Sequence, residues 1–277
     1  MKRLLMGLTL ALLLSHVVVA ADDDPDTVYT NLQKAIEEKK PAADIKPLAV
    51  QLLKLTAKPD GDAAAVKHAQ ELSRYAEYQL YTLAAAGPAP VTVELFSALE
   101  EASPKSEYLL SGYGTYLAAL GPAKGGPAAE KALNNFPEDI YLLAYAASDA
   151  FGKQANDKAL GYARRAIASR AKVPEGMNLN GMHYIAGMVY GAKNQFFECN
   201  KELRTALPSL SGDNERLARA LYYLGMSNYQ LGRTALNKAQ VLEGQKYADQ
   251  AAALASSVKS QAYQLAQTIK VDAARMR

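Results

Sequence analysis

The chain has 277 residues but no tryptophan, one cysteine and only three histidines. A single cysteine excludes an internal disulfide framework and a zinc site built from several cysteines. So few histidines leave little for a histidine-based active site. The formal net charge is only +3 at pH 7, which excludes a strongly basic nucleic-acid surface and an acidic tail. We therefore expect no catalytic residues, no metal, no cofactor and no nucleic-acid partner.

Sustained alternation of apolar and polar residues, the pattern of half-buried strands, is also absent from residues 26–275. Instead, Ala, Leu and Tyr recur at spacings of three and four residues between Pro, Gly and Ser breakers. The pattern predicts helices over 26–39, 43–57, 62–86, 91–102, 106–120, 126–135, 138–152, 155–171, 179–192, 194–207, 214–231, 244–257 and 259–275. Thirteen helices joined by short loops, without one dominant long helix, indicate an all-α stack of hairpins rather than a four-helix bundle.

The first residues predict an export signal. Lys2 and Arg3 precede an uncharged apolar run that ends at Ala20, and small residues flank a cleavage position before Ala21. This order is typical of a secretory signal peptide, of the bacterial export style, over residues 1–20. We expect an exported protein, periplasmic or extracellular. The alternative is an uncleaved signal anchor that tethers the chain to a membrane.

The helices repeat a pattern of small residues. Ala147 and Ala159 are separated by the same interval of residues as Gly187 and Cys199, and each pair falls where two antiparallel helices must approach closely. A third copy pairs Gly225 with a more distant small residue, Ala248. The longer interval predicts an insertion between its two helices, near residues 233–244.

These residues resemble the tetratricopeptide repeat family, whose unit is a helix–turn–helix of about 34 residues. The resemblance implies a right-handed superhelical α-solenoid, with degenerate hairpins over 21–104, clearer repeats over 105–257 and a C-terminal capping helix over 258–277. It also implies that certain positions of each first helix face a concave groove. Those positions hold Tyr141, Ser148, Phe151, Tyr184, Met188, Arg219, Tyr222, Met226 and Tyr229.

Tyrosine, with 17 copies, is the most informative residue type. We interpret the protein as a non-catalytic interaction module that binds a protein or peptide partner in a groove rich in Tyr and Met. Because only Arg219 is charged among the groove residues, we expect binding to depend weakly on salt. The competing interpretation assigns the tyrosines to core packing. A second function class is a structural accessory subunit of a cell-envelope assembly complex, and an enzyme is the third.

Three other residues are candidates for chemistry. His68 and Glu71 share a helix face, as a metal pair could, but no second such pair accompanies them. His183 falls at a large-residue position of the repeat and Cys199 at a small-residue position. We expect a solvated face for the pair and packing roles for His183 and Cys199.

Overall fold

The computed structural model describes residues 24–173 and 177–276, and all regular structure within these ranges is helical. The helices are α1 (Pro25–Glu37), α2 (Ala42–Thr56), α3 (Ala63–Ala86), α4 (Ala89–Ala102), α5 (Glu107–Ala132), α6 (Ile140–Gly152), α7 (Asn156–Ala168), α8 (Asn180–Ala192), α9 (Phe196–Ala206), α10 (Asn214–Thr234), α11 (Lys238–Ala253) and α12 (Lys259–Arg275), with short 3₁₀ segments η1 (Arg170–Lys172) and η2 (Leu207–Leu210). The predicted all-α class is confirmed. The predicted signal segment, 1–20, lies outside the described residues.

Helix α5 consists of two helices that fold back on each other at Gly121. The backbone of Gly121 is left-handed there, with φ 72° and ψ 175°. Leu117 and Gly125 are eight residues apart in sequence. Even so, the Leu117 carbonyl oxygen lies only 3.1 Å from the position that a Cβ on Gly125 would take. In a straight helix residues that far apart are separated by about 12 Å along the axis. The chain therefore bends back sharply at Gly121, and α5 consists of two helices, in line with the separate predictions for 106–120 and 126–135.

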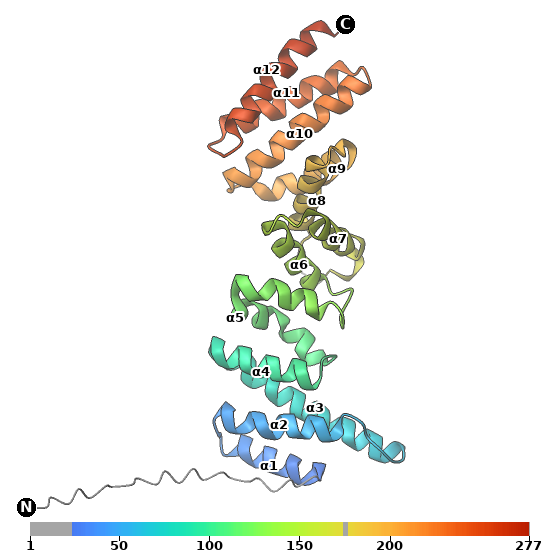
Figure 1. The fold of residues 1–277 in the computed structure, drawn as a ribbon, viewed down its shortest axis with the longest axis vertical. Coiled ribbons are helices and arrows are strands. Elements are labelled where there is room, and N and C mark those ends of the chain that lie inside the picture. Colours follow the sequence, from blue (N-terminus) through green and yellow to red (C-terminus); the bar gives the residue numbers. More distant parts are fainter. Residues whose placement is uncertain (1–23, 174–176, 277) are drawn as a thin grey trace, which may run out of the picture.

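The helices form an elongated column of stacked hairpins, with α1 at one end and α12 at the other (Figure 1). The hairpins are α1–α2, α3–α4, the two halves of α5, α6–α7, α8–α9 and α10–α11, and α12 follows the last of them. We call the first helix of each hairpin, together with α12, an A helix, and the second a B helix. Each helix packs on the next along the chain, and the A helices also contact one another in order. Such neighbour-only packing is typical of a helical solenoid.

One turn geometry recurs at four of the hairpins. Its central residue is a left-handed non-glycine, namely Lys39, Gln154, Asn194 or Leu236. In the α6–α7 turn the Ala155 amide donates to the Ala150 carbonyl at 2.8 Å and the Gln154 amide to the Phe151 carbonyl at 3.0 Å. The other three turns repeat both hydrogen bonds, which together define a Schellman motif. The first hairpin, within the segment expected to be degenerate, therefore closes in the same way as the clearer repeats.

Small residues sit where helices of a hairpin approach, as predicted. Ala147, Ala159 and Cys199 are fully buried. A Cβ on Gly187 would lie 2.6 Å from the Leu203 side chain of α9. The absence of a side chain at 187 therefore allows α8 and α9 to approach each other closely.

The predicted insertion near residues 233–244 is wrong. Helix α10 continues to Thr234 and α11 begins at Lys238, so the connection is as short as in the other hairpins. Gly225 and Ala248 do meet, because a Cβ on Gly225 would lie 3.1 Å from the Ala248 amide nitrogen. The extra residues lengthen both helices instead. No proline interrupts this stretch, and Gly244 packs against the backbone of α10.

Helix α12 is amphipathic, as expected for a helix at the end of a stack. Its buried residues, Ala262, Ala266, Ile269 and Ala273, recur every three or four positions. This helix packs on α10 and α11. Among the described residues, no helix is both long and apolar enough to cross a membrane.

Candidate binding face of the A helices

Two hollows lie on the A helices of the C-terminal half. The α6 hollow, of about 560 Å³, is lined by Pro122, Tyr141, Ala144, Tyr145, Ser148, Asp149, Gly152, Lys153 and Met177. The α10 hollow, of about 460 Å³, is lined by Met188, Arg219, Tyr222, Tyr223, Ser257, Val258 and Gln261. The predicted residues Tyr141 and Ser148 lie in the first hollow, and Met188, Arg219 and Tyr222 lie in the second. A row of A helices thus brings together more than half of the predicted groove residues.

The α6 hollow is built on the sharp fold of α5. A Cβ on Gly126 would lie 1.9 Å from the carboxyl carbon of Asp149, so a side chain at 126 would displace the Asp149 carboxylate from its present position. The Tyr145 hydroxyl donates to the Leu117 carbonyl at 3.4 Å, and Lys153 Nζ pairs with Asp149 at 2.8 Å. The polar groups of the hollow are therefore largely engaged. Tyr141 remains 45% exposed, which leaves its ring available for contact.

A line of contacting side chains crosses three A helices, α6, α8 and α10, without lining either hollow. The rings of Phe151 on α6 and Tyr184 on α8 meet edge to face, with centroids 6.1 Å apart. The guanidinium carbon of Arg216 on α10 lies 4.5 Å from the centroid of the Tyr184 ring. Burial raises the pKa of the Tyr184 phenol, although the positive charges of Arg216 and Arg219 oppose this shift. Tyr184 is only 3% exposed, so it supports the face from below instead of lining an open groove.

The charge of Arg219 in the α10 hollow is neutralised within the molecule. Its Nε donates to Glu215 at 2.7 Å and its Nη2 to the Ser257 hydroxyl at 3.3 Å. Hydrogen bonds from the Ser257 hydroxyl and amide, together with that of Arg219, lower the pKa of Glu215. This cluster ties α10 to the start of α12. What it leaves for a ligand is the half-buried ring of Tyr222 and the apolar floor.

Three further predicted residues are wholly or partly buried. Tyr229 is buried, and its hydroxyl donates to Asp272 of α12 while accepting from Arg233 at 3.3 Å. Met188 lines the α10 hollow but is only 7% exposed. Met226 is partly buried and lies outside both hollows. The packing interpretation of the tyrosines therefore describes Tyr184 and Tyr229, and the groove interpretation fits Tyr141 and Tyr222.

A larger and more polar hollow, of about 760 Å³, lies between α2, α3 and the start of α5. Glu77 of α3 accepts hydrogen bonds there from the hydroxyls of Ser103 and Ser106. Arg74 Nε lies 3.5 Å from the Tyr108 hydroxyl. Charged side chains of both signs line this hollow, and Arg74 and Glu77 are hydrogen-bonded there to the hydroxyl groups of Tyr108, Ser103 and Ser106. Glu77 was not predicted from the sequence. The loop that Glu77 binds was marked in the sequence by Ser103-Pro104 and by the helix-capping Ser106.

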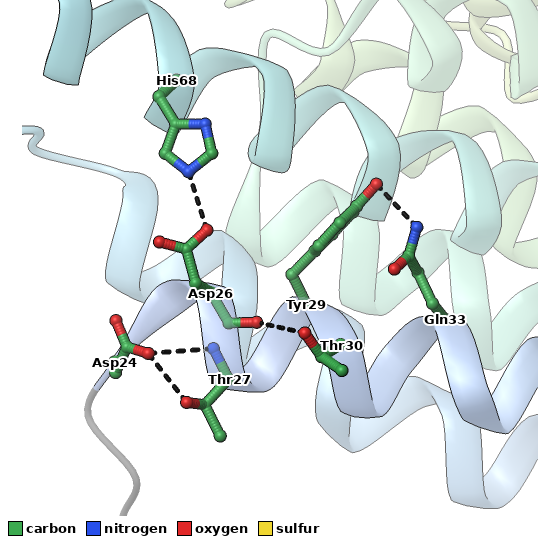
Figure 2. Close-up of polar contacts among 7 residues, drawn as sticks. All are labelled: Asp24, Asp26, Thr27, Tyr29, Thr30, Gln33 and His68. Atoms are coloured by element: carbon green, nitrogen blue, oxygen red, sulfur yellow. Dashed lines mark hydrogen bonds and ion pairs between the residues drawn. The ribbon is translucent and has the colours of Figure 1, made fainter.

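The residues singled out for chemistry have structural partners. His68 Nε2 of α3 lies 2.7 Å from a carboxylate oxygen of Asp26 in the first turn of α1 (Figure 2). The neighbouring Asp24 caps that helix, accepting from the Thr27 amide at 3.0 Å. His183 pairs with Glu202 across α8 and α9 at 2.5 Å. Within residues 24–173 and 177–276, no three His, Cys, Asp or Glu residues are grouped as a metal site requires.

No known protein-family model matches the chain, and a search of curated proteins finds no relative.

Proposed function

We propose that the protein is a non-catalytic interaction module whose A helices bind a peptide segment of another protein. The observation that carries this proposal is the presence of two hollows on one row of A helices, which hold five of the nine residues predicted to line a groove. Aromatic side chains bury a large area at little entropic cost, and methionine adapts to irregular ligands. Tyr141 and Tyr222 supply aromatic rings, whereas Met188 lines the α10 hollow with only 7% of its surface exposed.

We further propose that the hairpins are tetratricopeptide-like repeats in a right-handed superhelix. Three observations support this: the neighbour-only packing, the repeated Schellman turn, and the close contact at Gly187. In such a superhelix the A helices line the concave side, where a ligand contacts several repeats at once.

Export is the third part of the proposal. The charge and apolar pattern of residues 1–20 supports cleavage before Ala21. N-terminal sequencing of protein recovered from the cell envelope or the medium tests it. A start at Ala21, or one residue away, is expected. An intact Met1 on envelope protein would replace cleavage with a membrane anchor.

A second candidate is a structural accessory subunit of an envelope complex, held by flat contacts. It is favoured by large apolar side chains that are exposed away from the hollows. Phe197 on the B helix α9 is 68% exposed, Leu236 in the last hairpin turn 84%, and Tyr263 on α12 60%. If these side chains hold the partner, the two hollows take no part in binding it.

Site-specific photocrosslinking in the native host separates the two candidates. A photoreactive phenylalanine analogue is placed in turn at Tyr141, at Tyr222 and, as the matched B-helix position, at Phe197. The proposed function predicts adducts of one mass from 141 and 222 and none from 197. Adducts from 197 alone would favour the accessory subunit. A folded protein that crosslinks at none of the three positions would contradict both.

A further inference from the structure

We propose that the turn between α10 and α11 docks on a lipid bilayer that carries anionic headgroups, with Leu236 inserted and the neighbouring basic side chains on the headgroups. This inference does not depend on the proposed peptide-binding function. It starts from a comparison of the four turns that share the Schellman geometry. In three of them the left-handed central residue has a polar side chain, that of Lys39, Gln154 or Asn194. In the fourth it is Leu236, which is 84% exposed.

Leu236 is an unfavourable residue for the fold alone. Its φ of 53° lies in the left-handed region, which favours glycine and asparagine and disfavours a bulky side chain. Apolar burial could offset that cost, but most of the leucine side chain is in water. A residue that is both unfavourable in conformation and exposed indicates a contact outside the chain.

The charge beside this turn also differs from that of the other three turns. In each of those, a lysine next to the central residue forms an ion pair with a carboxylate. The pairs are Lys40–Glu38, Lys153–Asp149 and Lys193–Asp157. Among the described residues no carboxylate pairs with Lys238, which follows Leu236 by two positions and donates to the Met276 carbonyl at 2.7 Å. Its positive charge is therefore available to a ligand.

That hydrogen bond places the C-terminal end of α12 beside the turn, and further basic side chains come with it. Residues 231–241 and 270–276 contain four basic side chains and one acidic side chain, Asp272. Asp272 already faces Arg233, whose Nε lies 3.7 Å from its carboxylate. Arg275 is exposed and has no ion pair with another described residue. The exposed leucine thus lies beside a net positive charge.

This combination fits a bilayer better than a protein partner. Residues 233–239 are all exposed, so the turn projects from the column, and it lines none of the hollows described above. A protein partner requires a complementary surface of about 800 Å² on each side. A fluid bilayer instead accepts a single apolar side chain, and flexible basic side chains can reach its headgroups. Apolar insertion and positive charge are the two signals that together give stable peripheral binding to anionic membranes.

The docking turn and the α10 hollow are separate places on the molecule. From Tyr222, which lines that hollow, to Leu236 the chain advances about 20 Å along α10. Changes in the turn therefore leave the proposed peptide-binding face intact.

The test uses a fluorescent probe that reports contact between the turn itself and vesicles. The full chain carries nitrobenzoxadiazole on Ala239→Cys, an exposed position one helical turn beyond Leu236. The native Cys199 is fully buried, so the label goes to the new cysteine. Phe197→Cys is the matched control, because it holds the same place after the α8–α9 turn. Because the probe responds only to its own surroundings, vesicle binding by another part of the chain does not give the signal.

Two changes are then combined with the probe at 239. Leu236→Asn introduces the residue type that the α8–α9 turn carries at this place, and Lys238→Gln/Arg275→Gln removes two charges. Gln154→Asn, in the α6–α7 turn, is the matched control substitution. The vesicles contain phosphatidylcholine alone or phosphatidylcholine with about one third phosphatidylglycerol.

We expect the probe at 239 to shift to the blue and brighten with the anionic vesicles only, while the probe at 197 does not change. Leu236→Asn and the charge variant should each weaken binding to anionic vesicles about tenfold. Gln154→Asn should change it less than about twofold. Because asparagine suits the left-handed backbone, Leu236→Asn should unfold at the same urea concentration as the wild type or a higher one, so weaker binding would not reflect a damaged fold.

Several results would overturn the proposal. A probe at 239 that does not respond to anionic vesicles would refute docking, and an equal response to neutral vesicles would refute the role of charge. A Leu236→Asn variant that binds as tightly as the wild type would show that the leucine does not insert. A clear loss of stability in that variant would show that Leu236 serves the fold.

Discussion

Replacing Gly187 by alanine tests the helix packing on which the binding face is built. A mid-helix Gly→Ala change by itself stabilises a helix by about 0.5–1 kcal/mol. At Gly187 the new methyl carbon would lie 2.6 Å from Cγ and Cδ2 of Leu203 and 3.1 Å from its backbone nitrogen. Carbon atoms prefer separations of about 3.5–4.0 Å. Because a backbone atom is involved, α9 must move, at a cost of about 1–3 kcal/mol.

Gly161 in α7 is the matched control, since a Cβ there meets nothing within 4 Å. Both variants gain the same helix propensity, so the difference between them isolates the clash. In urea unfolding followed by circular dichroism, we expect Gly161→Ala to be stabilised by about 0.5–1 kcal/mol. Gly187→Ala should be less stable than Gly161→Ala by about 1–3 kcal/mol, and Gly187→Leu should be lower still. Equal stability of the two alanine variants would refute the close packing of α8 on α9.

Three further predictions concern single side chains. Burial raises the pKa of the Cys199 thiol to about 11. A thiol-reactive disulfide reagent at pH 8 should therefore label Cys199 only after the protein unfolds. Rapid labelling of the folded protein would contradict the burial of this thiol. Burial, with the charge of Glu100, raises the pKa of the Tyr113 phenol far above its usual range. Because the unfolded chain ionises this phenol near pH 10 and the folded one does not, its contribution to stability is present below about pH 10 and is lost as the pH rises above it. The Tyr113→Phe variant should therefore lose less stability between pH 9 and 11 than the wild type, as measured by urea unfolding. If the unfolding free energy of both proteins falls equally over this pH range, the raised pKa of Tyr113 is contradicted. The exposed pair of His68 and Asp26 should contribute less than about 1 kcal/mol to the free energy of unfolding. The His68→Ala variant should therefore have nearly the wild-type unfolding free energy at pH 6. A larger loss would show that the packing of α1 depends on this pair.

The sequence was sufficient to predict helix positions, because breakers and apolar spacing are local signals. It predicted both helices of α5 even though Gly121 is the only sharp break between them. The error near 233–244 arose because a longer interval between Gly225 and Ala248 can mean a loop or longer helices. Only packing distinguishes these possibilities, since Gly244 lies against α10.

The candidate face could be predicted only in part. Position within a repeat placed Tyr141 and Tyr222 on the A helices, where the hollows lie. It could not show that Tyr184 is covered, because Phe151 and Arg216 come from the helices on either side of α8. Arg216 was missed for the same reason. Its contact with Tyr184 depends on how three separate hairpins stack, and no local pattern encodes that.

The most direct test of the central claim is the affinity of the partner for a Tyr141→Ala/Tyr222→Ala double variant. Phe197→Ala serves as the matched control, and the unfolding free energy of every variant is measured alongside. We predict that the double variant binds at least about 2 kcal/mol more weakly, as at interface hot spots, while helicity is retained and Phe197→Ala binds normally. A folded double variant that binds as tightly as the wild type would contradict the assignment of the A helices as the binding face.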